Sequence, residues 1–229
     1  MLGRLGGGFS LAGSYAEGIA QPTFFDLYGF FPGTFVGNPS LKPESSRGFE
    51  VSLRYRKGPV SASLTGYRQR LHDEIVNNDS FTSVFNAPRV SRRSGIEAAV
   101  DWSPAKTVRL SVNYAYLNAT EPNAAGQQIT EARRPKHSGS VAVDGTVSRF
   151  TYGASLAYVG DHIDNRDTYP YARVTLASYW LADARVGYSV RKGVELFARG
   201  SNLLDQHYED AFSYRTEGRA FYAGVRLSG

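Results

Sequence analysis

Apolar and polar residues alternate along most of this chain with a period of two residues. Segment 47–57 is typical, with an apolar set of Phe49, Val51, Leu53 and Tyr55 separated by polar residues. Such alternation indicates a β-strand whose two sides differ chemically. The pattern predicts about ten strands, at residues 4–18, 47–57, 60–75, 93–102, 107–117, 137–147, 149–161, 175–190, 194–203 and 221–227.

The connections between these strands alternate in length. Tight turns are expected at KGP (57–59), SPAK (103–106), the DGTVS region (144–148) and VRKG (190–193). Long polar or aromatic connections fall at 18–46, 77–89, 121–135, 162–174 and 206–216. Short turns on one side and long loops on the other are typical of outer-membrane barrels. The predicted strands also exceed the five or six residues that are common in globular proteins.

The apolar faces of these strands need either a second sheet or lipid to cover them. The opposite faces carry too many Arg, Glu, Asp and Ser residues for a dry core without dense pairing. Aromatic residues lie near several strand ends, as interfacial girdles would place them: Tyr55, Trp102, Tyr116, Tyr158 and Trp180. We therefore predict an all-β, antiparallel transmembrane β-barrel portion with short periplasmic turns and long extracellular loops. A soluble β-sandwich is the alternative.

Composition narrows the class of protein further. The mean hydropathy of −0.34 and the absence of a long apolar run exclude a membrane protein built from helices. The chain has no Cys, so it can form neither a disulfide framework nor a thiolate metal site. The net charge is +5, but the Arg residues are scattered rather than clustered, and we expect no nucleic-acid partner.

The residues suited to chemistry are dispersed. The four histidines, His72, His137, His162 and His207, fall in different strands or loops. The run DHIDNRD (161–167) resembles a calcium loop but lacks its central Gly and terminal Glu, and we interpret it as a solvated acidic loop. No GxSxG, Walker-type or GxGxxG pattern is present. We therefore expect no enzyme activity, no cofactor and no metal site.

The stretch QPTFFDLYGFFPGTFVGNPSLKPE (21–44) is unusually aromatic for a loop. It carries six aromatic residues between Pro and Gly residues: Phe24, Phe25, Tyr28, Phe30, Phe31 and Phe35. Aromatic side chains in a loop can form a small local core. They can equally form a binding surface, because loops borne on a rigid scaffold often bind ligands. The sequence leaves both interpretations open.

Three segments together resemble the C-terminal part of TonB-dependent outer-membrane receptors: GNPSLKPE (37–44), NLLDQHYED (202–210) and GRAFYAGVRL (218–227). Further segments are similar to the vitamin B12 (cobalamin) receptor branch: LYGF (27–30), GYR (66–68), RRPKH (133–137) and YPY (169–171). The resemblance implies a barrel of roughly 22 strands with an N-terminal plug. Residues 1–229 would then be the C-terminal part of that barrel, with the plug and the N-terminal strands absent.

The resemblance also implies a location and partners. The protein would lie in the outer membrane of a Gram-negative bacterium, surrounded by its lipid. It would depend on the barrel-assembly machinery for insertion and on the TonB complex, through the missing N-terminal part, for energy. About ten strands leave two open edges, and whether the first and last strands pair is not decided by the sequence.

The function that the resemblance implies is TonB-dependent uptake of a large scarce nutrient, first of all cobalamin. The expected ligand contacts are the six aromatic residues of the loop 21–44 together with Asn78, Tyr171 and Tyr214. A siderophore or another metal chelate is the alternative ligand within the same family. A passive barrel that admits solutes through a polar lumen is the alternative outside it.

Overall fold

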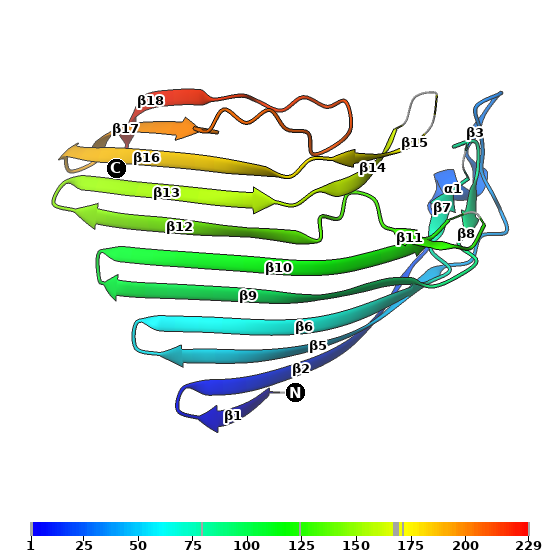
Figure 1. Cartoon of the computed structure of the whole chain (residues 1–229), viewed down its shortest axis with the longest axis horizontal. Coiled ribbons are helices and arrows are strands. Elements are labelled where there is room, and N and C mark those ends of the chain that lie inside the picture. The colour runs from blue at the N-terminus through cyan, green and yellow to red at the C-terminus, as the bar shows by residue number, and fades with distance from the viewer. Residues whose placement is uncertain (1, 79, 124, 167–169, 171, 229) are drawn as a thin grey trace.

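The computed structural model describes residues 2–78, 80–123, 125–166, 170 and 172–228. One large antiparallel sheet dominates the described chain (Figure 1). Its order is β1 (Leu2–Gly6), β2 (Phe9–Ala20), β5 (Glu44–Lys57), β6 (Val60–His72), β9 (Ser91–Ala105), β10 (Val108–Pro122), β12 (His137–Val147), β13 (Phe150–Val159), β16 (Tyr179–Arg191), β17 (Val194–Ser201) and β18 (Ala220–Leu227). The short β11 (Gln128–Thr130) pairs with β10 and completes twelve strands. The predicted all-β antiparallel class is confirmed.

The N-terminal segment differs from the prediction of one strand over residues 4–18. It forms a hairpin, β1 and β2, whose turn contains Gly6, Gly7 and Gly8 with φ angles of 84°, 62° and 96°. Side chains other than hydrogen rarely tolerate positive φ, so the glycine run specifies a turn here. A Cβ on Gly8 would also lie 2.7 Å from the carbonyl oxygen of Arg56.

The two faces of the sheet differ as the alternation predicts. The cross-strand register places Tyr15 opposite Phe49 on the apolar face, with ring centroids 4.7 Å apart. This face stays uncovered: the exposed fractions of Phe221 and Leu227 are 72% and 76%. Burying apolar surface contributes about 25 cal/mol per Å², so a continuous uncovered face of this kind favours contact with lipid.

The other face is polar and lined by ion pairs. Arg109 donates to Asp101 over 2.7 Å, and Arg185 donates to Asp144 on a strand further along the sheet. These pairs remain partly exposed, so each contributes little to stability. Their place on one face fits a wet barrel lumen.

The connections lie as predicted, with tight turns at one end of the sheet and long ones at the other (Figure 1). The long connections contain α1 (Phe24–Tyr28), β3 (Phe30–Phe31), β4 (Phe35–Val36), β7 (Ile75–Asn77), β8 (Val84–Asn86), β14 (His162–Arg166) and β15 (Ala172–Leu176). We call this the loop end. Among the described residues, no helix is long and apolar enough to cross a membrane.

The first and last strands do not meet. β1 and β18 occupy opposite edges of the sheet in the described residues, and each is paired on one side only. The open question of the sequence is therefore answered for this chain: its own two edges remain apart (Figure 1).

Candidate ligand-binding site

The aromatic loop folds into the short helix α1 followed by the β3–β4 hairpin. Thr23 caps the helix, because its Oγ1 accepts a hydrogen bond from the Asp26 amide at 3.1 Å while the Asp26 carboxylate accepts one from the Thr23 amide at 2.9 Å. This reciprocal capping box satisfies two donors that would otherwise lack partners. A five-residue helix needs such a cap because helix nucleation is unfavourable.

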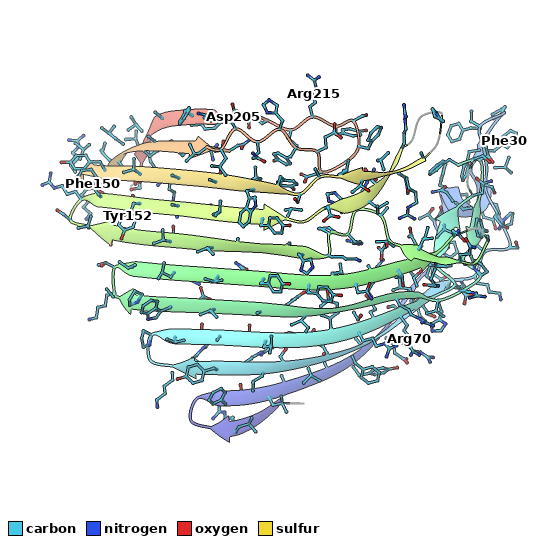
Figure 2. All side chains as sticks on the ribbon, viewed as in Figure 1. Phe30, Arg70, Phe150, Tyr152, Asp205 and Arg215 are labelled. Carbon is cyan, nitrogen blue, oxygen red and sulfur yellow. The ribbon has the colours of Figure 1, made fainter. Side chains whose placement is uncertain are left out.

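The six aromatic residues divide into two groups. Phe25 stacks on Phe35 with ring centroids 4.5 Å apart and also approaches Phe31 at 6.0 Å, which forms a small local cluster. Phe24 and Phe30 are the most exposed of the six, at 81% and 67%, and the Phe24 ring lies 5.1 Å from that of Tyr28 between centroids. Figure 2 shows Phe30 at the outer edge of the loop end. Phe24 and Phe30 are thus accessible to a ligand, and their role as ligand contacts stays a prediction.

The run GNPSLKPE fixes this loop to its neighbours. The Asn38 amide donates to the carbonyl oxygen of Asp26 at 2.7 Å, and its side-chain amide donates to the carbonyl oxygen of Val84 at 3.1 Å. A Cβ on Gly37 would lie 2.8 Å from backbone atoms of Leu27 and Tyr28, so only glycine fits there. The motif therefore joins α1 to the hairpin β7–β8 of the next long connection.

Asn78 lies at the tip of that hairpin, beside the aromatic loop. Its side-chain oxygen accepts hydrogen bonds from the amides of Thr82 and Ser83, at 2.8 and 3.3 Å. Thr82 in turn accepts a bond from the Val36 amide at 2.8 Å. The structure thus brings Asn78 to the aromatic loop, and its visible contacts shape a turn.

The two predicted tyrosines have different outcomes. Tyr171 lies outside the described residues. Tyr214 is exposed in the connection between β17 and β18, which runs above β14 and β16 rather than beside α1 (Figure 1). In Figure 2 its neighbour Arg215 lies well apart from Phe30. The predicted contacts therefore form two separate groups at the loop end.

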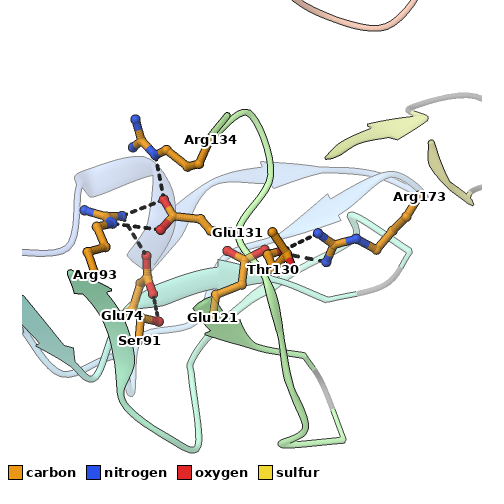
Figure 3. A network of polar contacts seen from close by, with 8 residues as sticks. All are labelled: Glu74, Ser91, Arg93, Glu121, Thr130, Glu131, Arg134 and Arg173. Atoms are coloured by element: carbon orange, nitrogen blue, oxygen red, sulfur yellow. Dashed lines mark hydrogen bonds and ion pairs between the residues drawn. The ribbon is translucent and has the colours of Figure 1, made fainter. Parts of the chain in front are cut away.

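A network of charges under the β10–β12 connection was not found from the sequence (Figure 3). The Glu131 side chain is mostly buried and accepts two hydrogen bonds from Arg93, each 2.7 Å, and one from Arg134 at 2.9 Å. Glu74 approaches Arg93 at 3.9 Å. Burial raises the pKa of Glu131, but the arginine hydrogen bonds outweigh this and hold its pKa below the ordinary value.

A second buried carboxylate joins three long connections. Asp164, which is 1% exposed, accepts hydrogen bonds from Arg133 at 2.8 Å, from the Phe212 amide at 2.7 Å and from the Asn165 amide at 2.8 Å. Burial opposes its charge, yet the bonds from Arg133 and the two amides lower its pKa below the ordinary value.

The interpretation of DHIDNRD as a solvated acidic loop is therefore wrong for Asp164. Asp161 of the same run is exposed, and Asp167 lies outside the described residues. The sequence shows the three carboxylates. It does not show that Arg133, 31 positions away, forms an ion pair with the middle one, Asp164.

The segment NLLDQ (202–206) has a structural explanation. The Asn202 side chain donates to the carbonyl oxygens of Gln206 at 2.9 Å and Glu217 at 3.2 Å, and it accepts from the Gln206 amide at 2.9 Å. The backbone amide of Asn202 donates to the Asp183 carboxylate at 2.9 Å. One buried amide thus closes the loop that leads into β18.

A cavity of about 640 Å³ lies among three of the long connections. Its lining includes aromatic, amide and guanidinium groups, namely Asn78, Phe81, Phe85, Asn165, Arg166 and Arg173. Within the described part of the chain, the Nε of Arg166 is buried without a hydrogen-bond partner, and its guanidinium carbon lies 5.7 Å from the ring centroid of Phe212. The size is that of ligand pockets in general.

Of the residues that line this cavity, the sequence predicted only Asn78. Phe81 lies in a turn, and Phe85, Arg166 and Arg173 lie in the short strands β8, β14 and β15, which are too short for a periodicity that would single them out. The one sequence feature that could have indicated these residues is a cationic or aromatic side chain in a long connection, and many other residues of the long connections have that feature.

The chain belongs to the family described as TonB dependent receptor-like, beta-barrel, which it matches over residues 4–203. Proteins of this family are transporters rather than enzymes, and they reside in the outer membrane of Gram-negative bacteria. The family assignment agrees with the sheet, its two faces and its two unequal ends. It confirms the receptor class and the membrane that the sequence resemblance implies.

Solved structures of similar fold include receptors for ferric chelates and a copper transporter. The ferric-catecholate import receptor Fiu of E. coli K12 has a TM-score of 0.79 at 20% identity, over 99% of this chain and 34% of that one. The ferripyoverdine receptor of Pseudomonas aeruginosa gives 0.78 at 14%, over 99% and 32%. The copper transporter OprC gives 0.75 at 18%, over 96% and 37%. The chain thus spans about a third of the length of these structures.

Proposed function

We propose that this chain forms the C-terminal part of the barrel of a TonB-dependent importer whose ligand is a metal chelate. The observation that carries the proposal is the cavity of about 640 Å³ at the loop end, with Arg166 and Arg173 beside Phe81 and Phe85. The Nε of Arg166 is buried without a hydrogen-bond partner among the described residues, and a ligand in the cavity would supply the missing acceptor. Chelates offer anionic oxygens and flat rings, which suit guanidinium and aromatic groups.

Cobalamin remains the second candidate ligand. Its support is the similarity of LYGF (27–30) and RRPKH (133–137) to the cobalamin receptor branch. Within RRPKH, Arg133 and Arg134 bind carboxylates of this chain, so the motif is engaged in holding loops together. The names of the similar structures refer to ferric chelates and copper, which favours the metal chelate.

The proposal includes the partners of the whole receptor. Energy would come from the TonB complex through a plug outside this chain, and insertion would depend on the barrel-assembly machinery. A passive barrel is the competing function. Uptake that continues unchanged in a cell without TonB would support the passive barrel and contradict the importer.

Binding to the complete receptor, purified in detergent, tests the ligand. The probes are a ferric tris-catecholate chelate, Cu²⁺ and cyanocobalamin. Arg166→Gln removes one of the two guanidinium groups of the cavity and should weaken binding of the ferric chelate about 10- to 100-fold, the contribution of a hydrogen bond to a charged group. Arg149→Gln, in the turn at the opposite end, is the matched control and should change nothing.

Three outcomes are distinguishable. Binding of the ferric chelate that weakens only in Arg166→Gln supports the proposal. Tight binding of cyanocobalamin alone would replace the metal chelate with the second candidate. Equal losses in Arg166→Gln and Arg149→Gln would show that the cavity is not the site.

A further inference from the structure

A row of four charged residues crosses the apolar face at its loop end: Glu17, Arg47, Arg70 and Arg92. The strand registers pair Glu17 of β2 with Arg47 of β5, Arg47 with Arg70 of β6, and Arg70 with Arg92 of β9. Arg68 lies two residues from Arg70 on the same strand and is paired with Phe49. Directly paired residues share a face, so these arginines point to the same side as Phe49. We call Arg47, Arg68, Arg70 and Arg92 the outer arginine row.

Most of this charge is not neutralised by the protein. Arg47 forms an ion pair with Glu17 at 3.2 Å. In the part of the chain that the structure describes, Arg68, Arg70 and Arg92 contact no carboxylate, and all three are exposed. Like charges directly opposite on neighbouring strands destabilise a sheet. Arg47, Arg70 and Arg92 are such neighbours, so the row favours an external anion between them.

The opposite face shows the contrast. At the same level Arg93, next to Arg92, points inward and binds Glu131 with two hydrogen bonds of 2.7 Å. Its carboxylate partner lies on the inner side of the sheet and cannot reach Arg92 on the outer side. The unbalanced charge is therefore a property of the outer face alone.

The row lies at the border of the apolar band. On β5, Arg47 is followed on the same face by Phe49, Val51, Leu53 and Tyr55, and Lys57 follows at the other border. Ten residues of strand span about 33 Å, which at the tilt of such barrels gives about 25 Å along the membrane normal, the height of an apolar band. Figure 2 shows Arg70 toward the loop end. The loop end of an outer-membrane barrel is its extracellular end.

We propose that the outer arginine row binds the phosphate groups of lipids in the outer leaflet. Guanidinium groups bind phosphate through paired, charge-assisted hydrogen bonds. Basic residues beside a membrane surface attract anionic headgroups. Neighbouring strands lie about 4.8 Å apart, so one phosphate can bridge adjacent arginines of the row. Phe49, one step toward the membrane interior, would contact the apolar part of the same lipid.

Lipid titration of the complete receptor in a neutral detergent tests this proposal. The probes are bis-phosphorylated lipid A, its dephosphorylated form and inorganic phosphate, with bound lipid counted by native mass spectrometry. The wild type should prefer the phosphorylated lipid. The triple variant R68Q/R70Q/R92Q should lose about 100-fold in affinity for it, at roughly fivefold for each arginine.

Two control variants separate the row from net charge and from folding. R4Q/R54Q/R56Q removes three charges from the inner face of β1 and β5 and should keep the affinity of the wild type. R68K/R70K/R92K keeps the charge and should retain most of the affinity for the phosphorylated lipid. Heat-dependent electrophoretic migration reports the folded barrel for each variant.

Several results would overturn the proposal. These are unchanged lipid affinity in R68Q/R70Q/R92Q, equal affinity for phosphorylated and dephosphorylated lipid, and a site filled by inorganic phosphate without lipid. Chelate binding should be unchanged in R68Q/R70Q/R92Q, so failure here is distinct from failure of the proposed function. If R68Q/R70Q/R92Q does not fold, single substitutions of Arg68, Arg70 and Arg92 give the same comparison.

Discussion

At the scale of single residues, Asp164 shows how one carboxylate can organise a loop end. It is buried, yet its main charged partner, Arg133, has a side chain that is 61% exposed. The Arg133 hydrogen bond makes the largest single contribution to the lowered pKa of Asp164, and the amides of Phe212 and Asn165 add to it. A side chain that keeps the shape but loses the charge should weaken these contacts.

Asp164→Asn is predicted to loosen the connection between β17 and β18. The amide group can no longer accept on both of its polar atoms, so the Phe212 amide or Arg133 loses its partner, at a cost of about 1–3 kcal/mol. Hydrogen exchange around Phe212 should accelerate accordingly. Asp161→Asn, in the same loop and exposed, is the matched control. Equal protection in the two variants would contradict the role of Asp164.

The acid response of the loop end follows from the lowered pKa values of Asp164 and Glu131. A carboxyl group with a lowered folded-state pKa stabilises the fold above its unfolded pKa, about 4 for Asp and Glu, and this contribution is lost as pH falls through the folded-state pKa. Hydrogen exchange of residues 131–135 and 208–214, corrected for intrinsic rates, should be constant from about pH 8 to pH 5. It should increase below about pH 4. Loosening between pH 7 and pH 5 would contradict this assignment.

At the scale of elements, the long strands were predictable and the short ones were not. The strand at 137–147 is found as predicted, because Val141, Val143 and Val147 share one face while Ser138, Ser140, Asp144 and Thr146 lie on the other. The segment predicted at 60–75 divides into β6 and β7 around Asp73, whose φ is 54°. The segment predicted at 175–190 begins partly in β15 and continues in β16. Backbone turns of single residues leave no periodic signal, so alternation alone cannot locate these breaks.

The aromatic loop gives a prediction at this scale, because its two groups of rings should respond differently. Phe25→Ala/Phe35→Ala removes the stacked pair, worth about 0.5–1.5 kcal/mol beyond its buried area, and should increase proteolysis within residues 21–43. Phe24→Ala/Phe30→Ala removes exposed rings and should leave proteolysis unchanged while weakening chelate binding to the complete receptor. Unchanged binding in Phe24→Ala/Phe30→Ala would remove these two residues from the site.

At the scale of the whole molecule, the sequence predicted the sheet, its two faces and its unequal ends, but little of the site. Its main contacts join distant positions: Arg93 meets Glu131 across 38 residues, and Asp164 meets Phe212 across 48. Such pairs depend on which strands become neighbours and on where each loop folds back. The aromatic loop was found because its composition is unusual in itself. The cavity, built from ordinary loop residues, became visible only in three dimensions.

The edges of the sheet give the last prediction. The antiparallel path from β1 to β18 has eleven strands with both edge strands included, so β1 and β18 run in the same direction, and closing the sheet on itself would pair them in parallel (Figure 1). Bacterial single-chain barrels have an even number of antiparallel strands, and lipid leaves unpaired backbone groups unsatisfied. The 229-residue chain expressed alone should therefore associate through its edges and elute as mixed oligomers in detergent.

Cysteine substitution can report on the edges directly, because the chain has no Cys of its own. Gly3→Cys in β1 and Val225→Cys in β18 place one thiol on each edge strand. We expect disulfides between chains when the 229 residues are expressed alone. The complete receptor should form none, since each edge would then pair with other strands. A compact monomer with a disulfide inside one chain would contradict this, and would show that β1 and β18 close the sheet.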